Sequence, residues 1–144
     1  LHAGQFAAAC GVTFHDGYGL PSEFAWKFYT CDPTGNLVHL TNPDYGSALV
    51  TARSQPENVE FLASPDEWFR PVNVANGPDG ALYIVDMYRA VIEHPKWVPV
   101  ELKDRKDTLS GNDRGRIYRI SDRNPSELVK QILQVKPVRK QDAG

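Results

Sequence analysis

The sequence predicts an all-β fold, and three observations lead to this prediction. The chain has 144 residues, of which 41% are hydrophobic and 24% charged, an ordinary globular composition with enough apolar material for a core. Short apolar or β-branched segments follow one another along the first 120 residues, separated by Gly, Pro, Asn and Asp. Two of the separating turns are short enough to join antiparallel strands.

Seven strands are expected in two series. They span 7–14, 26–31, 36–40 and 48–53 in the first series, and 72–75, 81–86 and 115–120 in the second. In the turn 32–35, Pro33 presets φ at the second position, and the turn 76–80 contains two glycines that can adopt positive φ. We therefore expect antiparallel meanders rather than parallel βαβ units.

The two series repeat a common pattern. Segments 31–38 and 77–84 both contain a Pro-polar-Gly turn followed by an alternating strand. Repeated short meanders build β-propeller blades. We predict a partial β-propeller over residues 1–122, with one blade at about 5–63 and another at about 64–122. Two blades cannot close a ring, and the single methionine is Met87, so we expect the remaining blades on a longer parent chain.

The end of the chain has a different pattern. Apolar residues recur at helical spacing over 126–135, after the start signal Asn124-Pro125 and before Pro137. Residues 123–144 are therefore predicted to form a short helix and a basic tail that lead out of the propeller.

Charge and hydropathy exclude two kinds of partner. Residues 1–100 contain five Lys or Arg against eleven Asp or Glu, whereas residues 101–144 contain eleven against seven. In the basic part, acidic residues interrupt the positive charges, so no coherent phosphate-binding patch forms and nucleic-acid binding is not expected. No apolar run approaches the roughly 18 residues of a membrane span.

The cysteines allow two readings. If the first two strands pair antiparallel, Cys10 and Cys31 lie side by side, and a disulfide between them would contribute about 3 kcal/mol and indicate an oxidising compartment. Two unpaired buried thiols are the alternative. The four histidines are scattered, so no metal site is predicted, and there is no C-x-x-C-H motif for haem attachment.

The candidate site lies in segments 64–72 and 83–95. In an antiparallel pair, the loop entering the first strand and the loop leaving the second meet at one edge of the sheet. Asp66, Trp68 and Arg70 should therefore meet a second set, which comprises Asp86, Tyr88, Arg89, Glu93 and His94. Such a convergence suits a small polar ligand such as a sugar. In the alternative, structural reading, Arg70 and Asp86 form an ion pair that pins the loop, and Trp68 and Trp97 are packing anchors.

The connection between the last two strands is also informative. It runs from Met87 to Arg114, far longer than the usual hairpin loop of about two to five residues. Loops of such length in compact domains are often functional.

Three segments carry a resemblance to a known family. FLASPDEWFRPVNVANGPDGALYIVDMYRAVIEHP at 61–95, CDPTGNLVH at 31–39 and DRGRIYRI at 113–120 resemble the closing part of a β-propeller in the bacterial family labelled membrane-bound dehydrogenase domain, or haem-binding CxxCH proteins. That family is in turn similar to soluble glucose and sorbosone dehydrogenases.

The resemblance implies a function and a location. The parent would be an exported protein, periplasmic or envelope-associated, that oxidises sugars or polyols with a non-nicotinamide redox cofactor. Pyrroloquinoline quinone is the candidate cofactor, with Arg70 or Arg89 as a cation that holds it, and haem c would belong to a domain of the parent outside this chain. The fragment alone is expected to be inactive, because one blade cannot form the whole site.

The convergence of the two loops and the resemblance together suggest residue roles. The candidate catalytic residues are Arg70, Asp86 and His94, with His94 as the base, and the candidate ligand-binding residues are Asp66, Trp68, Tyr88, Arg89 and Glu93. Two alternatives stay open: a non-catalytic propeller module that binds carbohydrate or a protein partner through Trp68, Tyr88 and Trp97, and a purely structural module.

Overall fold

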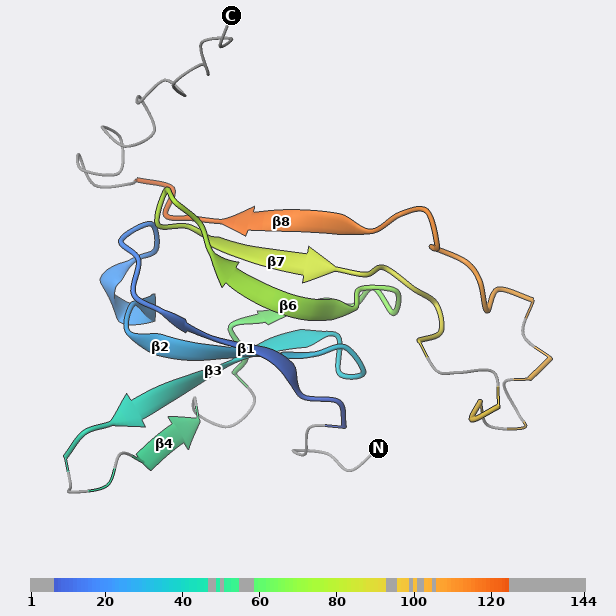
Figure 1. Ribbon diagram of the computed structural model, residues 1–144, viewed down its shortest axis with the longest axis horizontal. Coiled ribbons are helices and arrows are strands. Elements are labelled where there is room, and N and C mark those ends of the chain that lie inside the picture. The colour runs from blue at the N-terminus through green and yellow to red at the C-terminus, as the bar shows by residue number, and fades with distance from the viewer. Residues whose placement is uncertain are drawn as a thin grey trace, which may run out of the picture.

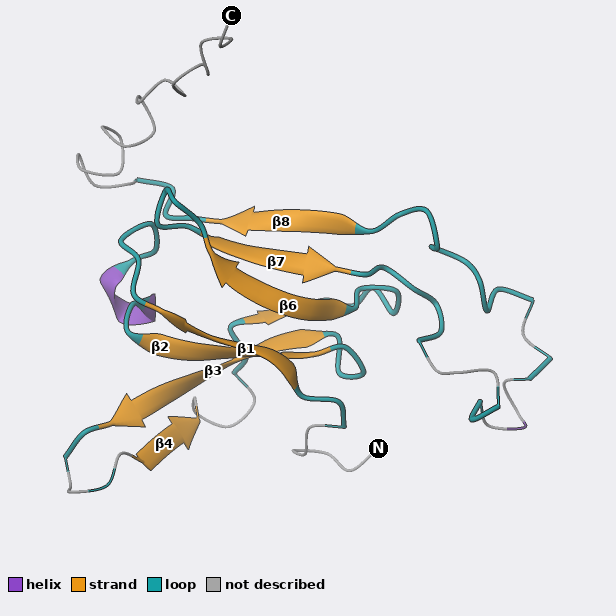
Figure 2. Cartoon of the chain, viewed as in Figure 1, coloured by secondary structure: helices purple, strands orange, loops and turns teal. Residues whose placement is uncertain are grey.

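The chain folds into two antiparallel β-sheets, so the all-β prediction is confirmed. The computed structural model describes residues 7–46, 49, 51–54, 59–92, 96–98, 100, 103, 104 and 106–124. Strands dominate this part of the chain (Figures 1 and 2). The predicted helix at 126–135 and the tail after it lie outside the described residues.

The first sheet is a meander with a divided edge. Its elements are β1 (Cys10–His15), β2 (Lys27–Asp32), β3 (Leu37–Asp44), β4 (Thr51–Ser54) and β5 (Leu62–Ala63), and the short 3-10 helix η1 (Ser22–Phe24) lies between β1 and β2. The strand order is β1-β2-β3-β4, and β5 also pairs with β3. β4 pairs with the second half of β3, from Thr41 onward, whereas β5 pairs with Leu37 and Val38. Because β2 occupies the other edge of β3, β4 and β5 share one edge.

The second sheet has three strands in sequence order. They are β6 (Pro71–Asn76), β7 (Leu82–Asp86) and β8 (Arg116–Ile120). Both predicted hairpins are confirmed: the turn after Asp32 joins β2 to β3, and the turn after Asn76 joins β6 to β7. Gly80 has φ of +75°, which explains why this turn ends on a glycine.

The two sheets pack through their first strands and enclose one core. In Figure 1, β6 lies beside β1 and β2. Thr13 Oγ1 donates to the carbonyl of Val74 at 2.6 Å, and Asn76 Nδ2 donates to the carbonyl of Phe14 at 2.9 Å. The buried side chains of the core come from both sheets; they are Leu20, Tyr29, Cys31, Val38, Leu40, Val74, Leu82 and Ile84. The two sheets therefore share one hydrophobic core.

A second contact joins the backbones of two glycines, Gly19 and Gly80, so closely that neither position has room for a side chain. The N–H of Gly19, in the segment between β1 and β2, donates to the carbonyl of Gly80 at 3.0 Å. A Cβ atom on Gly19 would lie 2.5 Å from the carbonyl atoms of Gly80. Two glycines are needed here because the backbones touch.

Some strand bounds differ from the prediction. The strand predicted at 7–14 starts only at Cys10, since the alanines before it have low β propensity. Gly11 then takes φ of +57° within an irregular register, where a Cβ would meet β6 at Asn73. The sequence did not predict β5, because a strand of two residues is too short to show an alternation of apolar and polar side chains. Residues 48 and 50 of the strand predicted at 48–53 lie outside the described residues, and β4 begins at Thr51.

Candidate functional site

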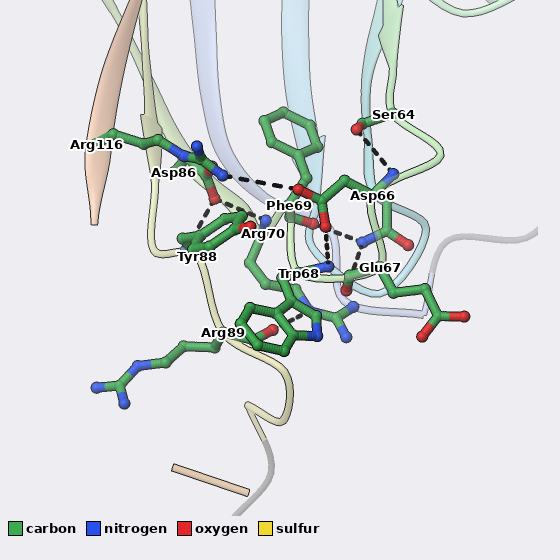
Figure 3. Close-up of polar contacts among 11 residues, drawn as sticks. Ser64, Asp66, Glu67, Trp68, Phe69, Arg70, Asp86, Tyr88, Arg89 and Arg116 are labelled. Atoms are coloured by element: carbon green, nitrogen blue, oxygen red, sulfur yellow. Dashed lines mark hydrogen bonds and ion pairs between the residues drawn. The ribbon is translucent and has the colours of Figure 1, made fainter. Parts of the chain in front are cut away.

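Two loops and one strand meet at one end of the second sheet, where β6 and β8 begin and β7 ends. Residues 64–70 lead into β6 and residues 87–90 leave β7, and Pro71 lies opposite Asp86 in the antiparallel register. β8 adds its first residue, Arg116, to the same end of the sheet, where it pairs with Asp86. We call the resulting group the rim cluster, which comprises Asp66, Trp68, Asp86, Tyr88 and Arg116 (Figure 3).

Asp66 shapes the loop that carries Trp68. Its N–H donates to Ser64 Oγ at 3.1 Å, its Oδ1 accepts the N–H of Trp68 at 3.0 Å, and its carbonyl accepts the N–H of Phe69 at 3.0 Å. Phe69 is buried, whereas Trp68 remains half-buried. The local turn therefore directs one aromatic ring to the core and leaves the next partly accessible at the rim.

Asp86 is the anchor of the rim cluster. Its side chain is completely buried. Oδ1 accepts the backbone N–H groups of Arg70 and Tyr88, both at 2.8 Å, and Oδ2 accepts Arg116 Nε at 3.1 Å. Tyr88 is held at φ of +50°, in the left-handed region that a tyrosine rarely adopts. One carboxylate thus fixes the entry to β6, the exit from β7 and the start of β8.

The Arg116 guanidinium group lies over the Tyr88 ring. Its guanidinium carbon is 3.6 Å from the ring centroid, and Trp68 meets the same ring edge-on with centroids 5.7 Å apart. Arg116 Nη2 also lies 3.8 Å from Asp66 Oδ2, and each of these two side chains is more than 40% exposed. The rim cluster therefore presents two aromatic rings, a cation and a carboxylate to a ligand from solution.

Arg70 acts as a clamp between loops. Its Nε donates to the carbonyl of Arg89 at 3.0 Å, Nη2 to the carbonyl of Ala90 at 3.1 Å and Nη1 to the carbonyl of Pro33 at 2.8 Å. Each nitrogen of the guanidinium group thus donates to a backbone carbonyl. This geometry gives Arg70 a positioning role and ties the loop after β7 to the first sheet.

The β2–β3 turn of the first sheet also holds the rim. Asn36, with φ of +56°, donates from Nδ2 to the carbonyls of Glu67 and Phe69. Pro33 in the same turn accepts from Arg70. The segment CDPTGN therefore supports the loop that carries Trp68, although the two lie more than 30 residues apart.

The structure brings together the described members of the predicted site. Trp68 and Tyr88 are in ring contact, Asp86 binds the Arg70 N–H, and the N–H of Arg89 donates to the carbonyl of Trp68 at 3.0 Å. The Arg89 guanidinium extends away from the rim cluster (Figure 3). Glu93 and His94 lie outside the described residues.

Trp97 is not a packing anchor, contrary to the structural reading of the sequence. Its side chain is 71% exposed, with Lys96 Nζ at 5.9 Å from the ring centroid. The structural reading therefore receives no support from Trp97.

The sequence prediction missed Arg116. A sequence signal existed, because Arg116 opens an alternating strand in the segment DRGRIYRI. Its position opposite Asp86 follows only from the β7–β8 register. The sequence does not specify this register, because a long connection and not a short turn joins the two strands.

Cys10 and Cys31 lie opposite each other in the β1–β2 register, which confirms the predicted pairing of their strands. Both are thiols in this structure, and the disulfide stays a prediction. Burial raises the pKa of Cys31 to about 12, with a further contribution from Cys10. The pKa of Cys10 is also raised, first by burial and then by the charge of Asp32.

Two negative findings apply to the described residues. They contain no group of three or more His, Cys, Asp or Glu side chains placed to hold a metal ion. They also contain no helix long and apolar enough to cross a lipid bilayer.

The rim cluster does not fit the quinone cofactor that the family resemblance implies. An anionic cofactor needs cationic side chains whose donors are available. Arg70 already donates to three carbonyls, and Arg116 already faces the carboxylates of Asp66 and Asp86. Arg70 and Arg116 are therefore matched, and the guanidinium of the other candidate cation, Arg89, extends away from the rim cluster (Figure 3), so we derive no reaction step through such a cofactor.

Comparison with known proteins gives one match. The family described as a domain of unknown function, DUF7133, matches residues 1–124. No curated protein and no solved structure matches the chain.

Proposed function

This chain belongs to the DUF7133 family, a domain of unknown function, and we propose that it forms two blades of a β-propeller whose rim cluster binds a sugar or polyol. The parent protein is exported, in this proposal, and resides in the periplasm or cell envelope.

The packing of the sheets supports the propeller. Successive blades of a propeller are meander sheets arranged around one axis. Here β1 and β6, the first strands of the two sheets, lie against each other, and both sheets share one core. Val85 and Ile117 are paired on the opposite face of the second sheet, where Ile117 is 67% exposed. This face suits a further blade of the parent chain.

The contacts of the Tyr88 ring, with Trp68 edge-on and with Arg116 over its face, are the observation that carries the binding proposal. The rings offer apolar faces for the C–H groups of a sugar, and the Arg116 guanidinium and Asp66 carboxylate offer a donor and an acceptor for its hydroxyls. Asp86 holds this arrangement from below with three hydrogen bonds. A preorganised surface loses less conformational entropy on binding.

Binding to a panel of neutral sugars and polyols, measured by isothermal titration calorimetry on the full chain, tests the proposal. We expect at least one member to bind, and Trp68→Ala to weaken its binding by about tenfold. Trp26→Ala is the matched control, because Trp26 is 62% exposed and lies directly before β2 of the first sheet, outside the rim cluster. Absence of binding to every member, or equal losses in both variants, would contradict the proposal.

Oxidation of the bound ligand is a second candidate function. The segments WFRPV and DMYR, which carry the dehydrogenase resemblance, both converge at the rim. In this proposal the parent protein oxidises a sugar or polyol with a non-nicotinamide redox cofactor that other parts of the parent would hold, and His94 is the candidate base for the hydroxyl proton. Sugar-dependent reduction of a dye by the full-length parent tests it, and a parent that binds sugar without such reduction would leave the non-catalytic binding module as the function.

A further inference from the structure

A cavity lies in the long connection between β7 and β8, beyond the rim cluster. It has a volume of about 370 Å³. This size falls within the range of small-molecule sites, roughly 300–1,000 Å³. The cavity is formed by residues at both ends of the connection, from Met87 to Leu109.

The wall of this cavity is mainly apolar. Its apolar lining comes from Met87, Val91, Ile92, Val98 and Leu109. Val98 is 7% exposed, whereas Leu109 is 73% exposed. The cavity therefore has a buried wall at Val98 and an accessible side at Leu109, as a site open to solvent requires.

Two cations line the same cavity. Arg89 and Lys103 both border it, together with the hydroxyl-bearing Thr108. Within the part of the chain that the structure describes, neither the Arg89 guanidinium nor the Lys103 ammonium group has an ion pair or hydrogen bond to another side chain. Two unmatched positive charges beside an apolar wall create a site for a negative charge attached to an apolar body.

The scaffold around the cavity is fixed at both ends. The N–H of Ala90 donates to the carbonyl of Ser110 at 3.3 Å, which joins the outgoing and returning parts of the connection. Gly111 has φ of +87°, and a Cβ there would collide with the carbonyl of Tyr88. Arg70 also donates to the carbonyls of Arg89 and Ala90. The backbone that carries Arg89 is therefore preorganised.

We propose that this cavity binds a small amphipathic anion, a carboxylate carried on an aromatic or aliphatic frame. Arg89 and Lys103 bind the carboxylate, and the apolar side chains from Met87 to Leu109 enclose the frame. The site is separate from the rim cluster, whose cation Arg116 faces two carboxylates and which suits a neutral ligand.

The experiment compares two probes that share one ring system. 2-Naphthoate and 2-naphthalenemethanol are titrated separately into the full chain by calorimetry. We expect the carboxylate to bind at least about tenfold more tightly than the alcohol, and added salt to reduce this difference. Equal affinities for the two probes, or no binding of 2-naphthoate, would overturn the proposal.

Matched variants identify the residues. Arg89→Gln and Lys103→Gln should each weaken 2-naphthoate binding by about tenfold and leave the alcohol unaffected. Arg114→Gln removes the same charge from a largely exposed pair with Asp113 and should change neither affinity. Lys103 is exposed, so its variant keeps the test valid even if the Arg89 variant folds poorly. Equal effects of all three substitutions would show a general charge effect and refute the site.

Discussion

Asp86→Asn should lower the free energy of unfolding by about 1.5 kcal/mol, because it removes one of three hydrogen bonds made by a buried carboxylate. The asparagine amide has nearly the same shape as the carboxylate. Its oxygen therefore continues to accept the N–H groups of Arg70 and Tyr88, which lie 2.8 Å from Asp86 Oδ1 in the native protein. At the other end an NH₂ group faces Arg116 Nε, where the carboxylate accepts at 3.1 Å. Two donors then oppose each other.

The magnitude follows from the surroundings of this bond. A hydrogen bond to a charged group contributes about 1.5–3 kcal/mol, and the lower end applies because the Arg116 side chain is 42% exposed and screened by water. Asp86→Ala also removes the acceptor of both N–H groups, which brings the expected loss to about 3–5 kcal/mol.

Equilibrium urea unfolding at neutral pH, followed by circular dichroism, measures both losses. The control is Asp113→Asn, whose carboxylate lies 3.8 Å from Arg114 with both side chains exposed, and it should change stability by less than about 0.5 kcal/mol. If Asp86→Asn matched this control, or if it cost as much as Asp86→Ala, Asp86 would not anchor the rim as described.

Three further predictions concern the scaffold. Gly19→Ala should lower the free energy of unfolding in urea by about 2 kcal/mol or more, because the new Cβ would lie 2.5 Å from backbone carbonyl atoms. Gly46→Ala should lower it less, because a Cβ there would meet only a side-chain oxygen at 3.1 Å. Equal losses in the two variants would contradict the close approach at Gly19. Burial alone would raise the pKa of Asp79, but the hydrogen bond from Arg119 and backbone N–H donors outweigh it and hold the pKa below its ordinary value. The stability that Asp79 contributes is therefore present above about pH 4 and lost on further acidification, and Asp79→Asn should flatten this acid limb of a pH–stability curve; an unchanged limb would show that other groups dominate it. Burial raises the pKa of Cys31 to about 12, so iodoacetamide should label it at neutral pH far more slowly in the folded than in the unfolded protein, and comparable rates would contradict its burial.

Turn chemistry made much of the fold predictable. Gly80 occupies a position of positive φ that favours glycine, and both hairpins formed where Pro33 and Gly80 indicated. The convergence of residues 64–70 with 86–90 followed from antiparallel pairing alone. β5, by contrast, has two residues and forms only because β3 offers an unpaired stretch at Leu37 and Val38.

The functions of individual side chains at the rim were less predictable. The sequence placed Arg70 beside Asp86, but it could not show that the Arg70 guanidinium binds carbonyls from two loops. It did not identify Arg116, because a residue about 30 positions after Asp86 becomes its neighbour only through strand register. Such long-range contacts depend on the packed fold and carry no local pattern.

The indole N–H signals of the three tryptophans provide the most direct test of the rim cluster as the ligand site. In a two-dimensional NMR titration with a sugar or polyol that binds, the Trp68 signal should shift in proportion to saturation. The signals of Trp26 and Trp97, which are 62% and 71% exposed and lie outside the cluster, should stay unchanged. A saturable shift at Trp26 or Trp97, with Trp68 unaffected, would contradict the account.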